Sequence, residues 1–263
     1  MPHDPEKGIQ AQRQYYTDTA AQYDEMHAHE AGDDYGNLRF ICALLGMLNA
    51  RTVLDVGAGT GRGIRHLLDA MPNLVVRGIE PVPALIEQAV RKNRIPEGVI
   101  VHGLGEALPF RDASFDVVCS FGILHHVPRP NAVVLEMLRV ARLGVIISDS
   151  NRFGQGRRLT RLLKLFLYKT GLWEAVNYMK TGGKGYLVSP GDGVAYSYSV
   201  YDSLEHVAEW ADRIILIPGE ISKAGSWFHP LLTAGTVLVC ALKERSDPSS
   251  ESVGCGRETG IRQ

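Results

Sequence analysis

The chain has few cysteines, no excess of one charge and no long apolar run. Its four cysteines are far apart and form no C-x-x-C pair, which argues against a disulfide scaffold or a zinc ribbon. Lysine and arginine total 28 and acidic residues 29, whereas a dedicated nucleic-acid-binding protein is usually strongly basic. No apolar run approaches the roughly 20 residues that span a bilayer, and the polar first residues do not resemble a signal peptide. We therefore expect a cytoplasmic globular protein without a transmembrane segment, and nucleic acid is an unlikely partner.

Short apolar segments alternate with amphipathic helical ones along most of the chain. Strands are expected at 52–56, 74–79, 99–102, 115–121, 143–147, 213–217 and 235–242, and helices at 38–48, 63–70, 84–92, 131–142 and 203–211. Continuous apolar strands between helices are typical of βαβ units, whose parallel sheet is covered on both faces. The pattern predicts an α/β fold, a Rossmann-like doubly wound sheet that is mostly parallel, with helices on both faces.

The alternation is interrupted between residues 151 and 201, where a basic helical stretch precedes a loop rich in glycine and tyrosine (182–198). No linker-like composition bounds this segment, so we interpret it as an insertion beside the sheet, within a single domain over residues 1–245. Residues 246–263 are rich in serine, glycine and charged residues and are expected to form a disordered tail.

A glycine-rich loop follows the first expected strand, with Gly57, Gly59 and Gly61 in the pattern G-x-G-x-G. Glycines there let the backbone turn tightly and approach a ligand, and the following helix directs its free N–H groups to the same place. A dinucleotide-binding fingerprint would require a third glycine at the position of Arg62. The arginine therefore disfavours an NAD(P)-dependent oxidoreductase, which we keep as one alternative function. Glu80 ends the second strand, where a carboxylate can accept hydrogen bonds from ribose hydroxyls.

Several segments in order resemble motifs of the class I S-adenosylmethionine (SAM)-dependent methyltransferases. Asp55–Gly61 is similar to the family's D-x-G-x-G-x-G motif, and Glu80–Pro81 to its ribose-binding acid. Further similar segments, within a match of roughly residues 50–150, are Glu106–Phe110, Ser114–Val118 and Leu124–Val127. The resemblance implies the strand order 3-2-1-4-5-7-6 with an antiparallel last strand.

The resemblance implies SAM as cofactor, S-adenosylhomocysteine (SAH) as product, and no metal. It assigns cofactor binding to Asp55, Gly57, Ala58, Gly59, Gly61, Glu80, Pro81, Gly105, Glu106, Ser120 and Tyr23. One position departs from the family: Leu104 stands where an acid commonly meets the adenine amino group. We expect backbone groups and apolar packing near Gly105 to hold the adenine instead. This departure keeps open a second alternative, a non-catalytic binding protein with the same fold.

Candidate catalytic residues are His125 and His126, which follow the fourth strand at the edge where ligands bind in open α/β sheets and could act as a general base. Tyr15 is a third candidate, because residues 1–49 resemble the helical lid over the cofactor in small-molecule methyltransferases. Candidate substrate residues are Asp149, Asn151 and Arg157. His27, His29 and Glu30 have ligand-type side chains, but no second cluster completes a metal site.

Residues 152–184 contain eight lysines and arginines against the single acid Glu174, a net charge of +7. On a helix, Leu159, Leu162, Leu163, Phe166 and Leu167 form an apolar stripe. The stripe could pack on the protein beneath a solvated basic face, or the arginines could recognise a carboxylate or phosphate on the acceptor. A weak membrane-surface contact through 157–168, or contact with RNA, is the third interpretation. The loop with Tyr186, Tyr196, Tyr198 and Tyr201 would suit an apolar or aromatic acceptor pocket, or it could be surface filler. With the activity that the resemblance implies, we expect methyl transfer to a small molecule that is apolar or aromatic and can carry an acidic group. The sequence makes no prediction of oligomeric state.

Overall fold

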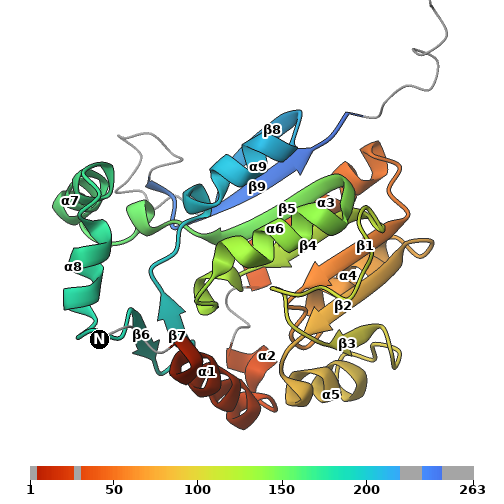
Figure 1. Cartoon of the computed structure of the whole chain (residues 1–263). Coiled ribbons are helices and arrows are strands. Elements are labelled where there is room, and N and C mark those ends of the chain that lie inside the picture. The colour runs from red at the N-terminus through yellow and green to blue at the C-terminus, as the bar shows by residue number, and fades with distance from the viewer. Residues whose placement is uncertain (1–4, 27–30, 220–232, 245–263) are drawn as a thin grey trace, which may run out of the picture.

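The computed structural model describes residues 5–26, 31–219 and 233–244, and its centre is a seven-stranded sheet (Figure 1). The strands lie in the order β3 (Ile100–His102), β2 (Val75–Glu80), β1 (Thr52–Val56), β4 (Phe115–Phe121), β5 (Ala141–Ser150), β9 (Thr236–Leu242) and β8 (Arg213–Pro218). Neighbouring strands from β3 to β5 are parallel, and β9 runs antiparallel to both β5 and β8. The predicted fold class, strand order and antiparallel last strand are confirmed.

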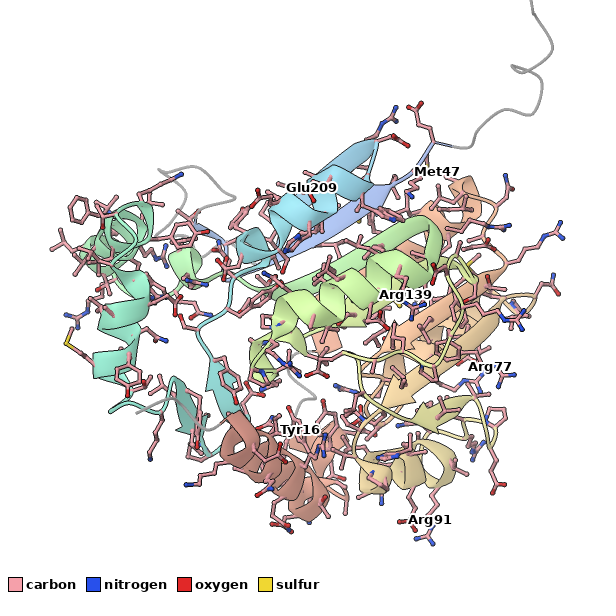
Figure 2. All side chains as sticks on the ribbon, in the orientation of Figure 1. Tyr16, Met47, Arg77, Arg91, Arg139 and Glu209 are labelled. Atoms are coloured by element: carbon pink, nitrogen blue, oxygen red, sulfur yellow. The ribbon has the colours of Figure 1, made fainter. Side chains whose placement is uncertain are left out.

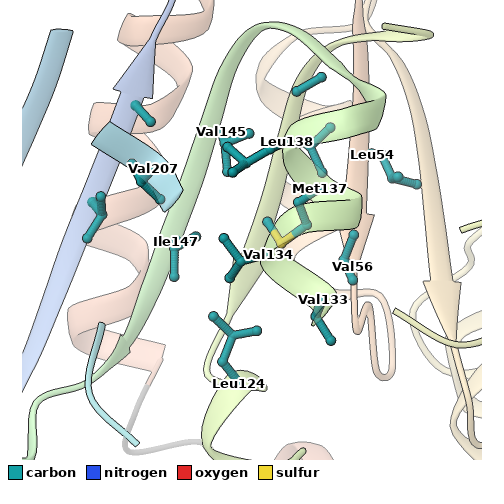
Figure 3. Packing of buried hydrophobic residues seen from close by; sticks show 14 of the residues in the cluster. Leu54, Val56, Leu124, Val133, Val134, Met137, Leu138, Val145, Ile147 and Val207 are labelled. Atoms are coloured by element: carbon teal, nitrogen blue, oxygen red, sulfur yellow. The ribbon is translucent and has the colours of Figure 1, made fainter. Parts of the chain in front are cut away.

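Helices cover both faces of this sheet. One face carries α3 (Ala31–Met47), α4 (Arg62–Ala70) and α5 (Pro83–Arg91), and the other carries α6 (Pro130–Val140) and α9 (Leu204–Trp210). Successive residues of a strand face opposite sides, so Val53 packs with α3 and α4 while Leu54 and Val56 pack with α6. Figure 3 shows the apolar cluster on the face covered by α6 and α9, in which Val133 and Met137 of α6 lie over the strands.

The N-terminal residues and the insertion lie at one end of the sheet. The N-terminal helices are α1 (Pro5–Thr19) and α2 (Tyr23–Met26). The insertion contains η2 (Arg152–Gly154), α7 (Arg158–Lys169), α8 (Trp173–Lys180), the strands β6 (Tyr186–Ser189) and β7 (Gly193–Tyr196), and η3 (Val200–Asp202). The strands β6 and β7 pair as an antiparallel hairpin, so part of the expected loop at 182–198 is regular structure. In Figure 1, α1 lies beside this hairpin, and α7 and α8 extend away from the sheet.

One interpretation of α7 is that its apolar stripe packs on the protein. In the described part of the protein most of this stripe is exposed instead. Leu159 is 82% exposed, Leu163 55% and Phe166 62%, and α7 has no buried residue. Figure 2 shows side chains projecting outward around this helix. Helical periodicity identifies a stripe but does not say what covers it, so the interpretation of α7 as a packed helix with a solvated basic face is wrong for the described residues.

Within the described segments, none of the helices has both the length and the apolar character that crossing a membrane would require. The expected disordered tail at 246–263 lies outside the described residues, as do His27, His29 and Glu30.

Candidate functional site

A cavity of about 490 Å³ opens at the carboxyl ends of β1, β2 and β4. Seven of the predicted cofactor residues line it: Tyr23, Gly57, Gly59, Glu80, Pro81, Gly105 and Glu106. Leu104 also lines it, beside Gly105 and Glu106, as expected for an adenine held by backbone and apolar groups. Helix α1 closes the opposite side through residues that the sequence did not single out, namely Glu6, Ile9, Gln12, Arg13 and Tyr16. Figure 2 shows Tyr16 on α1 at this end of the sheet.

The loop after β1 is shaped by glycines in the left-handed region. Gly57 has a φ of 78°, and a Cβ there would lie 2.7 Å from the side chain of Ile123. Gly61 has a φ of 75°, and its Cβ would lie 2.8 Å from Ile95. Only glycine meets both demands without strain. Gly57 therefore shapes the cavity wall itself, whereas Gly61 lets the start of α4 pack on the core.

Glu80 is the polar anchor of the cavity. One carboxylate oxygen accepts the N–H of Gly59 at 2.9 Å, and the other accepts the N–H of Val82 at 3.0 Å. The side chain is buried, and this burial raises the pKa of Glu80 to about 7, although the two N–H donors lower it. The carboxylate thus joins the glycine loop to the start of α5 and borders the space in which a ribose would bind.

Four other predicted cofactor residues, Asp55, Ala58, Gly61 and Ser120, do not line the cavity. Asp55 lies at the end of β1 beneath the loop, where burial raises its pKa to about 7 and the charge of Glu80 adds to the effect. The thiol of Cys119 is 3.9 Å from the Asp55 carboxylate. Asp55 therefore lies outside the cavity, beside the start of α4, where its Oδ2 would be 3.5 Å from a Cβ on Gly63.

The paired histidines lie on η1 (Leu124–His126), directly after β4, and each ring is oriented by a hydrogen bond. Nδ1 of His125 donates to Oδ1 of Asp149 at 2.7 Å, and Nδ1 of His126 donates to the backbone oxygen of Val194 at 2.6 Å. Burial opposes a charge on His125, but the carboxylates of Asp149 and Asp192 outweigh it and raise the pKa of the ring to about 10. The surroundings of His125 therefore favour a positive charge.

A second cavity, of about 240 Å³, lies between this histidine pair and the insertion. His125 and Asp192 line it on one side, and aromatic and basic residues of the insertion line the rest: Arg152, Lys164, Trp173, Lys180, Tyr186, Tyr196 and Tyr198. Since His126 lines the larger cavity and its ring centroid is 3.9 Å from that of His125, the two cavities are separated by this pair of rings.

Arg152 is a basic residue of the insertion for which no separate role is predicted from the sequence. Its side chain is buried, and Nη2 forms an ion pair with Asp202, but among the described residues Nε and Nη1 have no hydrogen-bond partner. The guanidinium lies 5.5 Å from the ring centres of Tyr168 and Trp173. Burial and the neighbouring charges of Lys180 and Arg152 lower the pKa of Lys164, which shows how closely these cations are grouped.

The remaining predicted residues lie outside both cavities. The phenol of Tyr15 donates to the backbone oxygen of Pro190 on the hairpin turn at 3.0 Å. Asn151 is buried and donates to the backbone oxygen of Ala234 at 3.0 Å, so it fastens the start of the insertion to the sheet. Asp149 acts through His125, and Arg157 is exposed at the start of α7. No direct substrate contact follows from these four positions, and their catalytic or binding roles stay predictions.

Residues 54–148 match the family model described as a methyltransferase domain. A protein of Mycolicibacterium gilvum, named an uncharacterized methyltransferase, is 34% identical over 228 residues, covering 87% of this chain and 80% of that protein. A second protein of that name, from Mycolicibacterium paratuberculosis, is 31% identical over 181 residues, covering 64% of this chain and 70% of its own. The chain belongs to the class I SAM-dependent methyltransferases.

Solved structures share the fold of this methyltransferase at low sequence identity. One is a Thermotoga maritima protein described as a possible histamine N-methyltransferase, with a TM-score of 0.57, 17% identity, and coverage of 88% of this chain and 99% of that chain. Another is the magnesium protoporphyrin IX methyltransferase of Synechocystis with bound SAH, with a TM-score of 0.58, 15% identity, and coverage of 88% and 98%. These likenesses show the fold alone.

The larger cavity of the methyltransferase fits SAM in three respects. Its volume lies within the 300–1,000 Å³ typical of small-ligand sites. The Glu80 carboxylate borders it, with lone pairs beyond the two that accept N–H groups. The wall has no room for a Cβ at Gly57 and little room at Gly105, where the nearest atom would be 3.0 Å away, so the backbone itself forms the cradle.

Proposed function

We propose that this methyltransferase transfers a methyl group from SAM to a small acceptor that has an apolar or aromatic body and carries an acidic group. The observation that carries the proposal is the second cavity, which adjoins the first across the His125–His126 pair. At about 240 Å³ it has room for roughly eight water-sized groups, which suits a small molecule and not a macromolecular segment.

The acidic group of the acceptor would bind Arg152. A buried guanidinium is costly unless its donors are satisfied, and Nε and Nη1 of Arg152 have no partner within residues 5–26, 31–219 and 233–244. A carboxylate accepts hydrogen bonds from a guanidinium in a fork, which makes arginine suited to this task. Lys164 and Lys180 add positive charge to the same cavity, while Trp173 and Tyr198 supply aromatic walls for the acceptor's body.

Bound SAM supplies the reactive chemistry, a methyl group on a sulfonium that is open to in-line attack. The protein would hold SAM and the acceptor in the positions that this attack requires. Glu80 and the glycine loop would hold the nucleoside, α1 covers it, and the second cavity would hold the acceptor on the other side of the histidine pair. Alignment of two bound reactants accounts for a large part of the rate in such a reaction.

The first test is calorimetric titration of the purified protein with SAM, SAH and NADH. We expect micromolar binding of SAM and SAH without a response to NADH. Binding of NADH alone would favour the oxidoreductase alternative, and binding of none of the three would favour a non-catalytic protein.

The acceptor class is tested by methyl transfer from labelled SAM to a panel of aromatic acids and their uncharged methyl esters. We expect turnover of the acids, and Arg152→Lys should reduce it at least tenfold because the planar fork is lost. Arg91→Lys is the matched control, since Arg91 is exposed on α5 and outside both cavities. SAH affinity should stay unchanged in both variants; equal turnover of acids by Arg152→Lys and wild type would contradict the role of Arg152.

A further inference from the structure

We infer that His125, His126 and Asp192 form a binding site for a divalent transition-metal ion. Nε2 of His126 lies 3.2 Å from Oδ1 of Asp192, and Nε2 of His125 lies 3.5 Å from Oδ2. One ligand atom from each of the three residues lies within 4.8 Å of the others. In a tetrahedral site with bonds of about 2.0–2.2 Å, ligand atoms are about 3.3–3.6 Å apart. The two spacings between the rings and Asp192 are therefore close to those of a coordination sphere, and the third ligand pair lies within 4.8 Å.

The outer hydrogen bonds of the two rings point to the same conclusion. A histidine that binds a metal nearly always donates its other ring N–H to a carboxylate or a backbone carbonyl. Here Nδ1 of His125 donates to Asp149 at 2.7 Å, and Nδ1 of His126 donates to the oxygen of Val194 at 2.6 Å. Both rings are thus fixed with Nε2 directed at the carboxylate of Asp192.

The acid that orients His125 is itself held firmly. Asp149 is buried, and its carboxylate accepts the N–H of Leu124 at 2.7 Å and that of Ser150 at 2.6 Å. Carboxylates then lie on both sides of the His125 ring, one from β5 and one from the hairpin turn, and their negative charge would offset a metal cation that takes the place of the proton on Nε2.

A set of direct ion pairs is the competing explanation. Both contacts, at 3.2 Å for His126 and 3.5 Å for His125, lie within the roughly 4 Å of an ion pair, so the distances alone fit either explanation. Two rings that converge on one carboxylate, each with its other nitrogen already used, are better explained by a shared ion at the centre.

Two imidazoles and one carboxylate suit Zn²⁺, Fe²⁺ or Mn²⁺, whereas Mg²⁺ and Ca²⁺ prefer all-oxygen sites. Three protein ligands leave coordination positions open, and the site borders both cavities. An ion there would bind an oxygen or nitrogen of the acceptor and lower its pKa, as metal ions do for bound water. This catalytic use rests on the proposed function, whereas metal binding itself does not.

The test uses the full-length protein, stripped of metal by a chelator and then titrated with Zn²⁺ by calorimetry and with Co²⁺ by visible absorption. We expect one ion per chain. Asp192→Asn keeps the size of the partly exposed side chain and should weaken Zn²⁺ binding by more than about tenfold. Asp192→Ser is the second variant, and His206→Gln on α9, which lines neither cavity, is the matched control and should bind like the wild type.

No stoichiometric ion in the wild type, or unchanged Zn²⁺ affinity in both Asp192 variants, would overturn the inference in favour of ion pairs. SAH is titrated into the same samples. If the protein binds SAH but no metal ion, the metal site is rejected and the proposed function is not. If it binds a metal ion but no SAH, the proposed function is rejected and the metal site is not.

Discussion

Binding of SAH should depend on pH through the carboxylate of Glu80, which is 4% exposed and borders the larger cavity. Burial raises the pKa of this carboxyl group to about 7. Ribose hydroxyls that donate to Glu80 stabilise its charged form, so the ligand binds the deprotonated protein more tightly. The affinity for SAH should therefore rise as the pH increases through 7.

The size of the effect follows from the fraction of protein that is charged at Glu80. With a pKa of about 7, roughly one molecule in eleven carries this charge at pH 6, and about ten in eleven at pH 8. If only the charged form binds, the apparent Kd is the intrinsic Kd divided by that fraction. The Kd at pH 6 should then be about tenfold that at pH 8, a difference of about 1.4 kcal/mol.

The assay is calorimetry with SAH at several pH values between 6 and 8, repeated in two buffers of different ionisation enthalpy. At pH 7 about half a proton should be released per ligand bound. Glu80→Gln should bind SAH about 1–3 kcal/mol more weakly and without pH dependence. Asp55→Asn should keep the dependence, because Asp55 does not line the cavity. A constant wild-type Kd with no proton release would refute the role of Glu80.

The carboxyl groups of Glu80 and Asp55 should also make the free energy of unfolding depend on pH. This free energy should fall as the pH rises, whereas the affinity for SAH should increase. The pKa values of Asp55 and Glu80 are raised to about 7 from ordinary values of 3.8 and 4.5. The folded protein therefore holds protons that the unfolded chain has released, and this contribution to the free energy of unfolding is complete below about pH 4 and lost as the pH rises through 7. Denaturant titrations of the ligand-free protein at pH 5 and pH 8 measure it, and Asp55→Asn should reduce the difference.

Three further expectations concern the loop, the adenine and α7. Gly57→Ala should lower the free energy of unfolding by about 1–3 kcal/mol and abolish SAH binding, because the new Cβ would meet Ile123. Gly98→Ala is the control, with a similar φ of 79° but open space around its Cβ, and should retain SAH binding. Equal SAH affinity in the two variants would refute the idea that the contact with Ile123 shapes the cavity. Leu104→Asp should strengthen SAH binding if the carboxylate reaches the adenine amino group, and unchanged affinity in calorimetry would mean that backbone groups suffice. The exposed apolar face of α7, beside basic residues, should bind anionic lipid vesicles, and Phe166→Asp should reduce the amount of protein that co-sediments with them. An unchanged amount of co-sedimenting protein would refute this contact.

Features that depend on neighbours in the chain could be predicted from the sequence. The glycine loop and Glu80 were found because each follows a strand directly, and parallel strands bring their carboxyl ends to one edge of the sheet. The same rule placed His125 and His126 after β4. Asp55 was assigned to the cofactor by resemblance, but the sequence could not show that its side chain lies beneath the loop.

Features that depend on the packing of the insertion could not be predicted. Asp192 is 66 residues beyond His126, on a hairpin turn within what the sequence predicted as a loop, so no spacing rule connects them. Arg152 was one of eight basic residues with nothing local to distinguish it, and only burial beside Trp173 and Tyr168 sets it apart. The exposure of α7 shows the converse: its pattern was clear, but a pattern does not identify a packing partner.

The two cavities are joined structurally by Gln12 of α1. Its side-chain oxygen accepts the N–H of Val194, and its side-chain nitrogen donates to the backbone oxygen of Asp192 at 3.3 Å. Gln12 also lines the larger cavity, and Val194 accepts the hydrogen bond that orients His126. A displacement of α1 would therefore open the cofactor cavity and release the hairpin turn that carries Asp192. Because one helix holds both walls, the proposed acceptor site would be complete only when α1 covers the cofactor cavity, and this would couple the binding of the two reactants and exclude water from the space between them.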